Sequence, residues 1–484
     1  MSFVYSFICT KFFFSDINSL YTKAAIDYQY PIGKYKIEIG SDLERNIEVH
    51  QNEIFFKGKK IICGSAHVRI LPPQNLKFPF LQYRVNDLHV FLSLCKKCAL
   101  TKTKKCNHDQ SLRAFESCWL ISDLNKALSL GYEIIKWFEL HHYEKTDFIL
   151  KYYSKILYAL KLQNSGFPPG VNTYDQKVQY CQNINEAMQF SDEFKLDLNN
   201  VCLNEGQKNF FKSMLNNFYG KFSQNSNYTQ TNFVNSHNQL MNLFQNNDVV
   251  GIYNINEFNL QVEFRPTKIP TNKQSCIYVG GQITSYARII VYDYIMDLVN
   301  QGARIYSVIN DAIFYSLPEN VLDPLPFSNV CGHFKPVVDP SKTIISYFSL
   351  GNCNYSFLTQ NNDGSLEQTI KVKGLTLSNF SNKNSITTDM FENFIDEHFS
   401  QNMRNILVKQ QKIRVDKETK QFQLKFQNFT FDNDPHLKRF IPNINLTIET
   451  YPYGFLLPNI AFCKKRKLSE SKNIGEAYKK MKFL

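Results

Sequence analysis

The stretch Phe12-Phe13-Phe14-Ser15-Asp16-Ile17-Asn18-Ser19-Leu20-Tyr21 is the part of the sequence around which the rest is interpreted. Its three consecutive aromatic residues predict a buried strand, and Asp16 is the first acidic residue after them. A carboxylate at the end of a strand is well placed to contact a ligand. An Asp before Asn-Ser is, however, more often an ordinary turn or helix cap. A functional interpretation of Asp16 therefore needs partners elsewhere in the chain.

The composition predicts a large globular protein with a basic surface. The 484 residues are 43% hydrophobic and include 41 Phe and 27 Tyr, enough for a core shared by two or three subdomains. The sequence contains no run of about 18 uncharged apolar residues, so a membrane span is not expected. The formal charge of +12 at pH 7 favours a polyanionic partner, and a solvated basic surface without a partner is the alternative.

The expected location is intracellular. The apolar segment 1–10 lacks the basic start and the cleavage site of a signal peptide. The runs Lys464-Lys465-Arg466-Lys467 and Lys479-Lys480-Met481-Lys482 weakly favour the nucleus over the cytoplasm. A frayed, charged terminus is the simpler interpretation of both runs.

A group of cysteine and histidine residues has the spacing C-x2-C-x7-C-x-H, from Cys95 and Cys98 to Cys106 and His108. Three thiols and one imidazole are a complete tetrahedral ligand set for Zn²⁺. The alternative is a set of reduced cysteines in a basic surface loop. A zinc ion here would be structural, because four protein ligands leave no position for a reacting water.

The segment Gln207–Lys221 predicts an amphipathic helix. At about 100° per residue, its polar side chains fall within an arc of roughly 80°. These polar residues are Lys208, Lys212, Asn216 and Tyr219. The predicted core side consists of Phe210, Phe211, Met214, Leu215 and Phe218. Two lysines one turn apart repel each other, and a bound polyphosphate would turn this repulsion into attraction. A solvated face is the alternative.

Three further segments complete the pattern. The Asn/Gln-rich residues 225–247 predict a surface loop, and 275–298 predict a long helix. Two strands, 303–308 and 312–316, are expected to pair through a tight turn at Ile309-Asn310-Asp311. Asp311 is thus a second carboxylate at a strand end.

Taken in order, three of these segments resemble the polymerase motifs of family B DNA polymerases. Asp16 to Tyr21 matches D-x-x-S-L-Y, Lys212 to Gly220 matches K-x-x-x-N-x-x-Y-G, and Asn310-Asp311-Ala312 matches the turn that usually reads D-T-D-S. Other segments are similar to the protein-primed branch found in Polinton (Maverick) elements and adintoviruses. These segments are the Cys/His group, Ser165 to Pro168, Thr284 to Arg288, Lys371 to Gly374 and Tyr451 to Gly454.

The resemblance implies an α+β, right-hand fold with an antiparallel palm, helical fingers, a thumb and an inserted cysteine-rich subdomain. The expected division is a palm strand at 1–40, the insertion at 41–150, fingers at 151–225, palm at 226–360, a thumb-like region at 361–458 and a basic tail at 459–484. The exonuclease and terminal-protein regions that precede the first motif in such enzymes are not recognisable, so the chain is expected to begin at the palm.

The resemblance also implies roles for individual residues. Asp16 and Asp311 would bind two Mg²⁺ or Mn²⁺ ions. The incoming dNTP would contact Ser19, Leu20, Tyr21, Lys208, Lys212, Asn216 and Tyr219, with Tyr21 under the sugar and Lys208 where the family usually has Arg. Primer-template DNA would contact Gly220, Arg288, Lys371, Lys373, Lys438 and Arg439.

Two functions are compatible with this pattern. The first is a DNA-directed DNA polymerase that replicates a viral or transposon-like element, with a terminal protein as a further partner. The second is a DNA-binding protein that keeps the fold without full catalysis. Ile309 and Ala312 replace the first Asp and the Ser of D-T-D-S, and Cys353 replaces a Lys. Asp311, the carboxylate that is retained, is the one that the family pattern makes a metal ligand.

Overall fold

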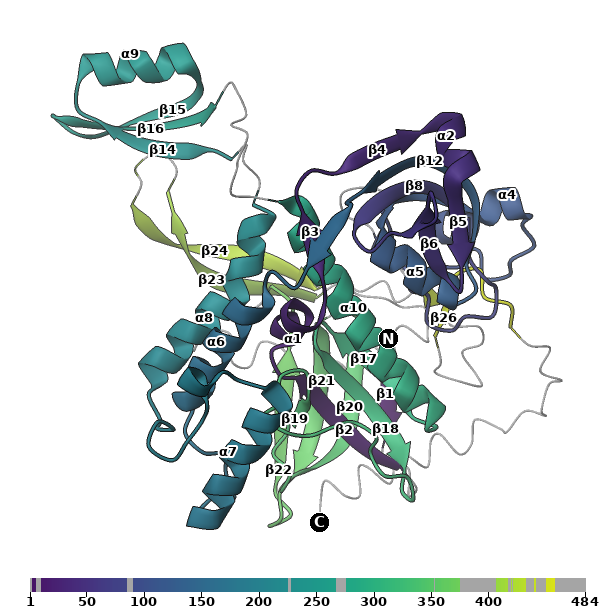
Figure 1. Cartoon of the computed structure of the whole chain (residues 1–484). Coiled ribbons are helices and arrows are strands. Elements are labelled where there is room, and N and C mark those ends of the chain that lie inside the picture. Colours follow the sequence, from purple (N-terminus) through teal and green to yellow (C-terminus); the bar gives the residue numbers. More distant parts are fainter. Residues whose placement is uncertain are drawn as a thin grey trace.

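The structure is a computed structural model of the whole chain (Figure 1). The residues that it describes are 2–5, 10–84, 90–224, 228–266, 276–351, 353–374, 406–416, 419, 421–431, 439–440 and 450–457. Lys438 and the basic tail 459–484 lie outside the described residues, so their predicted roles are untested. Among the described helices, none is long and apolar enough to cross a membrane.

The predicted strand at Phe12–Phe14 lies inside the central sheet. This sheet is antiparallel and has the order β17-β18-β2-β19. Its strands are β17 (Arg304–Ile309), β18 (Ala312–Pro318), β2 (Thr10–Ile17) and β19 (Phe334–Pro336). The predicted hairpin of β17 and β18 is confirmed, and the register places Ala312 opposite Asp16.

A second antiparallel sheet packs against one face of the central sheet. Its order is β1-β20-β21-β22, with β1 (Ser2–Tyr5), β20 (Thr343–Gly351), β21 (Asn354–Gln360) and β22 (Leu366–Lys371). Aromatic rings fill the space between the sheets, and the closest pair, Phe314 and Tyr347, stacks with centroids 3.8 Å apart. Because such rings bury large apolar areas, they fix the position of β2 and of Asp16 at its end.

Helices cover the other face of the central sheet (Figure 1). They include α1 (Leu20–Asp27) and α10 (Ile277–Asn300), which confirms the long helix predicted at 275–298. The chain leaves β2 and enters α1 within a few residues, so Asp16 lies between a buried strand and a helix amino terminus.

Three further helices pack beside α1: α6 (Lys151–Gln163), α7 (Tyr174–Met188) and α8 (Glu205–Phe222), with a short turn η1 (Asp192–Phe194). The predicted amphipathic helix is α8, and Leu215 is buried as expected. Phe210 is 59% exposed, so its assignment to the core side was wrong. The carboxyl end of α8 approaches α10 closely: a Cβ at Gly280 would lie 1.7 Å from Ser223 Oγ.

Most of the region expected to be the insertion, together with residues 36–39 before it, forms the inserted lobe around a four-stranded sheet of order β11-β8-β12-β4. Its strands are β4 (Lys36–Ile39), β8 (Gly64–Leu71), β11 (Phe115–Leu120) and β12 (Glu133–His142). Smaller elements of the lobe are α2 (Gly40–Asn46), β5 (Ile47–His50), β6 (Glu53–Phe56), β7 (Lys59–Lys60), β9 (Tyr83–Arg84), β10 (Val90–Phe91), α3 (Lys96–Thr101), α4 (Gln110–Arg113) and α5 (Ile121–Ser129). The short pair β3 (Tyr30–Ile32) and β13 (Lys145–Asp147) joins the lobe to the helices.

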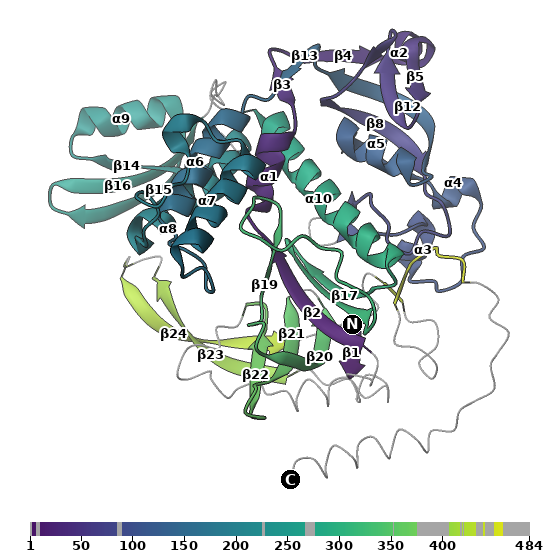
Figure 2. The same ribbon diagram turned by 60° about the horizontal axis from the view of Figure 1, so that its bottom comes forward.

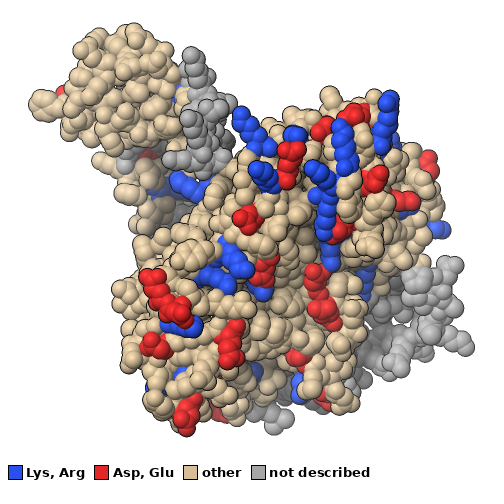
Figure 3. Space-filling view, in the orientation of Figure 1, with Lys and Arg blue, Asp and Glu red and all other residues tan. Residues whose placement is uncertain are grey.

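The polar segment 225–247 is not the loop that its composition predicts. It contributes β14 (Gln230–Val234) and α9 (His237–Asn246), which join β15 (Asn247–Asn256) and β16 (Asn259–Pro266) in a separate lobe. Residues 228–266 therefore do not form part of the central sheet, although the sequence assigned them to the palm. Figure 3 shows few charged side chains on the visible face of this lobe.

The last described elements lie in two places. The hairpin of β23 (Ile406–Val415) and β24 (Phe422–Phe431) extends outward from the second sheet (Figures 1 and 2). The short strands β25 (Arg439–Phe440) and β26 (Tyr451–Pro452) pair with each other on the inserted lobe. The strand β22, which the sequence placed in the thumb-like region, belongs to the second sheet.

Candidate active site and metal centre

The structure brings the two predicted carboxylates together. Asp311 lies in the turn between β17 and β18, where Asn310 has a φ of 56° and so allows a tight reversal. The backbone N–H of Ile17 donates to the Asp311 carbonyl at 2.9 Å, which ties this turn to the end of β2. Since Ala312 lies opposite Asp16, the register brings the Asp16 and Asp311 residues together at the end of β2.

The environment of this pair suits a divalent cation. Burial raises the pKa of the Asp311 carboxyl above its ordinary value, and the neighbouring charge of Asp16 raises it further. Two facing carboxylates repel each other when both are ionised, and Mg²⁺ or Mn²⁺ between them removes this repulsion. The carboxylate oxygens can therefore coordinate such an ion, and the ion would relieve the repulsion between them.

A third charged side chain, that of Lys335, lies beside the two carboxylates, and the sequence did not reveal it. Lys335 lies opposite Asp16 in the pairing of β19 with β2, and its Nζ is 2.8 Å from Asp16 Oδ2. Its side chain is 54% exposed, whereas that of Asp16 is 21% exposed. No local motif marks this lysine, because the pairing of two distant strands creates the contact.

The turn after Asp16 is held by the chain around residue 330. Asn18 donates through its backbone N–H to the His333 carbonyl at 2.8 Å and through Nδ2 to the Ser328 carbonyl at 2.7 Å. Ser19 precedes α1 with a φ of 52°, and its own side chain does not cap this helix end. The N–H groups of the first turn of α1 are thus available to an anion such as a triphosphate.

Lys161, on α6, is a second charged residue beside this turn that the sequence did not reveal. Its Nζ donates to Ser19 Oγ at 2.9 Å, at the start of α1. Burial lowers the pKa of Lys161 to about 8, and the positive charges of Lys335, Lys212 and Lys208 contribute to this shift. The ammonium groups of Lys161 and Lys335 therefore lie beside the turn, while Lys208 pairs with Glu205 at 3.3 Å on α8. The two groups at the turn are in a place suited to a polyphosphate.

Aromatic stacking joins the first and second predicted motifs. The rings of Tyr21 and Tyr219 are nearly parallel, with centroids 4.6 Å apart. Burial raises the pKa of Tyr219, and the nearby Tyr21 and Asp311 add to the increase, which places the stack beside the carboxylate pair. Leu20 is 3% exposed, so its side chain belongs to the core and only its backbone is available to a nucleotide.

Comparison with known proteins agrees with this geometry. A family model described as DNA polymerase type B, organellar and viral, matches residues 4–167. Phi29 DNA polymerase in complex with primer-template DNA and incoming nucleotide is similar in structure, with a TM-score of 0.51, 14% identity and coverage of 89% of this chain. The chain has the fold of Phi29 DNA polymerase. It covers 59% of that structure, so it spans less than two thirds of the length of the Phi29 enzyme.

A second Phi29 DNA polymerase structure, an orthorhombic crystal form, gives the same result. Its TM-score is 0.50 at 15% identity, and the alignment covers 88% of this chain and 58% of that one. A comparison with curated proteins found no significant match. The right-hand, α+β expectation for the type B fold is thereby confirmed.

The predicted DNA contacts have different environments in this fold. Lys371 and Lys373 are exposed at the end of β22, and Gly220 is exposed on α8 with open space around its Cα. Arg288 Nη2 lies 2.6 Å from Asp123 Oδ2, in an ion pair that links α10 to α5. These residues stay predictions as DNA contacts.

Arg439 has a different role from the predicted DNA contact. Its guanidinium donates to the Lys77 carbonyl at 3.1 Å and to the Thr450 carbonyl at 2.8 Å, and burial lowers its pKa to about 10. A guanidinium that is occupied by backbone carbonyls holds the chain in place. Arg439 therefore fastens the carboxyl-terminal part of the polymerase fold to the inserted lobe.

The predicted Cys/His group forms a compact cluster in the same lobe. The ligand atoms of Cys95, Cys98, Cys106 and His108 all lie within 4.8 Å of one another. His108 Nδ1 is 3.2 Å from the Cys98 sulfur and 3.5 Å from the Cys95 sulfur. Burial raises the pKa of the Cys95 and Cys98 thiols, a penalty that a bound metal ion reverses by coordinating thiolates. The donor set fits a tetrahedral metal site.

The cluster also contacts the carboxyl-terminal segment of the fold. The Leu94 N–H donates to the Tyr453 carbonyl at 2.7 Å, and Phe440 and Tyr453 share a buried core with the three cysteines. Gly454 has a φ of 91°, and a Cβ there would lie 2.5 Å from Cys95 Cβ. Only glycine can occupy position 454 at this distance, so the segment 450–457 and the cysteine cluster are closely packed.

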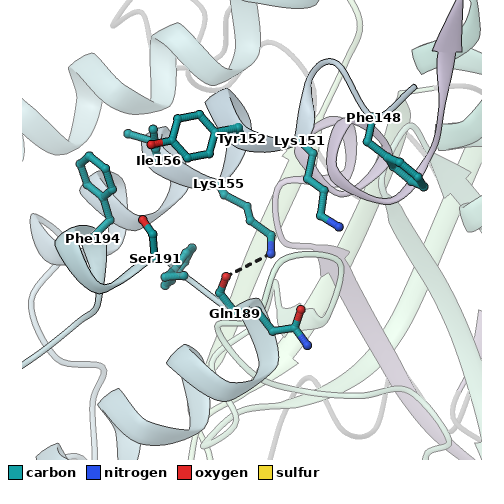
Figure 4. Close-up of a pocket in the computed structure, with 9 residues that line it drawn as sticks. Phe148, Lys151, Tyr152, Lys155, Ile156, Gln189, Ser191 and Phe194 are labelled. Carbon is teal, nitrogen blue, oxygen red and sulfur yellow. Dashed lines mark hydrogen bonds between the residues drawn. The ribbon is translucent and has the colours of Figure 1, made fainter. Parts of the chain in front are cut away.

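A pocket of about 370 Å³ lies near the amino end of α6 (Figure 4), and neither Asp16 nor Asp311 lines it. It is lined by Phe148, Lys151, Tyr152, Lys155, Ile156, Gln189, Phe190, Ser191 and Phe194. Lys155 Nζ donates to the Gln189 carbonyl at 3.2 Å. No carboxylate lines this pocket, so it offers no metal site for polymerase chemistry.

Proposed function

We propose that this chain is a DNA-directed DNA polymerase that adds deoxynucleotides to a primer. The observation that carries the proposal is the meeting of Asp16 and Asp311, from distant parts of the chain, beside converging lysines and the open amino end of α1. Nucleotidyl transfer requires this combination of a metal-binding carboxylate pair and a cationic triphosphate site.

Each part of the site has a defined task in this proposal. Asp16 and Asp311 would hold Mg²⁺ or Mn²⁺, which would activate the primer hydroxyl and stabilise charge on the triphosphate. Lys161, Lys208 and Lys212 would bind and orient the triphosphate. The Tyr21 ring, supported by Tyr219, would lie under the deoxyribose. Ser19 would be oriented by its hydrogen bond from Lys161.

The proposed division of the molecule follows from these tasks. The central and second sheets form the palm, α6 to α8 form the fingers, and the hairpin of β23 and β24 belongs to the thumb. Primer-template DNA is the proposed partner, since it is present in a Phi29 complex of similar fold. The net charge of +12 and the exposed Lys371 and Lys373 support sequence-independent contacts with phosphates.

Primer extension on a short primer-template with dNTPs and Mg²⁺ or Mn²⁺ tests this function. Incorporation that requires template, dNTP and a divalent metal is the expected result. The competing function is DNA binding without catalysis, which Ile309 in place of a carboxylate and the contact of Lys335 with Asp16 favour. Salt-dependent binding without incorporation under either metal would support this second function.

The biological setting is a finer proposal. The segments similar to Polinton and adintovirus polymerases support replication of a viral or transposon-like element, with a terminal protein as primer. An initiation assay that supplies candidate terminal proteins from the same element and follows label transfer to protein tests this setting. Label found only on DNA primers would argue against it.

We also propose that Cys95, Cys98, Cys106 and His108 bind one structural Zn²⁺. The support is the compact Cys3His donor set, with three buried cysteines, and its contact with the segment 450–457. The ion would join the inserted lobe to the end of the fold.

Lys161 provides a pH-dependent test of the nucleotide site. With a pKa of about 8, Lys161 is mostly charged at pH 7 and mostly neutral at pH 9, so the KM for dNTP is expected to rise over this range. The substitution Lys161→Met should raise KM about tenfold at pH 7 by removing one charged contact. Steady-state primer extension at several pH values measures both effects.

Two variants serve as controls for this prediction. Lys161→Arg keeps its charge throughout the range and should flatten the dependence of KM on pH. Lys155→Met, on the same helix but facing the pocket of Figure 4, should leave KM unchanged. Parallel pH profiles for the wild type and Lys161→Arg would contradict the assignment of Lys161.

A further inference from the structure

We propose that Lys335 is a built-in cation that competes with the metal for Asp16 and transfers to the triphosphate when a nucleotide binds. This inference rests on the proposed polymerase function and adds a residue that sets how tightly the site takes up metal. It is carried by the position, exposure and neighbours of Lys335.

The backbone fixes Lys335 beside Asp16. Strand β19 pairs with β2 so that the two residues are directly opposite each other. On either side, Phe334 donates to the Pro326 carbonyl at 2.7 Å and Val337 donates to the Phe14 carbonyl at 2.8 Å. The Cα of Lys335 is thus held in place, while its long side chain, 54% exposed, keeps the freedom to move its ammonium group.

The ammonium occupies space that a metal ligand needs. With Nζ 2.8 Å from Asp16 Oδ2, it satisfies one of the carboxylate oxygens available to a cation at this edge. A divalent ion that uses this oxygen must displace the ammonium or bind against its repulsion. An ion pair with an exposed partner contributes little to stability, so displacement is feasible but lowers the apparent metal affinity.

The charge balance of the site strengthens this competition. The hairpin carries Ile309 rather than a second carboxylate, so Asp16 and Asp311 alone supply the negative charge of the turn. The positive charge of Lys335 and the two negative charges of Asp16 and Asp311 sum to about −1, so the attraction for a divalent ion is reduced. A site with this balance is expected to bind free metal weakly.

A bound nucleotide offers the ammonium a second partner. Lys335 Nζ contacts Asp16 at 2.8 Å and Lys161 Nζ contacts Ser19 Oγ at 2.9 Å, so both ammonium groups lie on the same short turn between β2 and α1. A triphosphate among these lysines would attract Lys335 as well and free the Asp16 oxygen. Metal and nucleotide would then bind with positive coupling, since each removes an obstacle to the other.

Mn²⁺ binding followed by electron paramagnetic resonance tests the inference without requiring catalysis. In the absence of nucleotide and DNA, Lys335→Met is expected to bind Mn²⁺ about three- to tenfold more tightly than the wild type. Lys335→Arg keeps the charge and should retain weak binding. With dATP present, the advantage of Lys335→Met should shrink, because the wild-type ammonium has moved to the triphosphate.

Asp16→Asn separates failure of this inference from failure of the proposed function. If Asp16→Asn loses Mn²⁺ while Lys335→Met binds it as the wild type does, Lys335 does not compete and the inference is overturned. If Asp16→Asn binds Mn²⁺ as tightly as the wild type, the proposed metal site is itself wrong. Since the Lys335 side chain is exposed, thermal melting of Lys335→Met should match the wild type, and Lys335→Gln provides a second neutral variant.

Discussion

Asp311→Asn is expected to reduce primer extension on the order of 10³-fold while leaving the fold intact. The amide has the same shape as the carboxyl group but lacks the charge that holds a divalent ion. The hydrogen bond from Ile17 reaches the Asp311 backbone carbonyl, so the substitution does not disturb the turn. Single-turnover extension with Mg²⁺ and with Mn²⁺ measures the loss.

The stability of this variant distinguishes a catalytic role from a structural one. The pKa of Asp311 is raised, so folding favours its protonated form and the ionised form costs stability at neutral pH. This cost is present above the folded-state pKa and disappears as the pH falls below the ordinary Asp value. Asn removes the cost, and the melting temperature at pH 7 should be equal to or higher than that of the wild type.

Asp297→Asn is the matched control, because Asp297 is an exposed carboxylate on α10. It should extend primers at the wild-type rate. Full activity in Asp311→Asn would show that the carboxylate pair does not perform the chemistry. Binding of DNA by an inactive wild type would instead favour the non-catalytic function.

Local signals placed Asp16 and Asp311 at strand ends, and the resemblance to the family B motifs then paired them. Three aromatic residues mark β2 as buried, and Asn310-Asp311 supplies the turn between two short strands. The order of the motifs then indicated that Asp16 and Asp311 would meet. Such local patterns depend on turn chemistry and burial, both of which can be interpreted from a few neighbouring residues.

Lys161 and Lys335 could not be predicted in the same way. Lys335 meets Asp16 through the pairing of β19 with β2, and Lys161 meets Ser19 because α6 packs beside α1. A lone lysine carries no information on which distant strand or helix it will face. Arg439 shows the converse case, since it was expected to contact DNA whereas its guanidinium is occupied by backbone carbonyls.

The sequence of the lobe at 228–266 contains helix and strand signals, although its composition is typical of a loop. Ser236 caps α9 by accepting from the Gln239 N–H, and Leu240, Leu243 and Phe244 have helical spacing. Residues of β15 alternate between partly buried and exposed positions. Abundant Asn and Gln suggested a loop, but spacing was the better guide to structure here.

Removal of metal from the Cys3His cluster is expected to release the segment 450–457 from the inserted lobe. Without the ion, three buried thiols and an imidazole lose the interaction that compensates for their burial. The Leu94 to Tyr453 hydrogen bond and the close contact at Gly454 depend on the position of Cys95. Amide exchange in 450–457 should accelerate about 100-fold or more after chelation, measured by mass spectrometry.

Three variants distinguish the effect of losing the metal ion from the effect of disturbing the packing at Gly454. Cys98→Ser should reduce the metal content of the purified protein from about one zinc per chain to near zero and accelerate exchange in 450–457. Cys118→Ser, at an exposed cysteine outside the cluster, should change neither. Gly454→Ala places a Cβ against Cys95 and should release the segment even with zinc available. Absence of zinc from freshly purified protein, or unchanged exchange in Cys98→Ser, would refute the role of the ion in fastening the end of the fold.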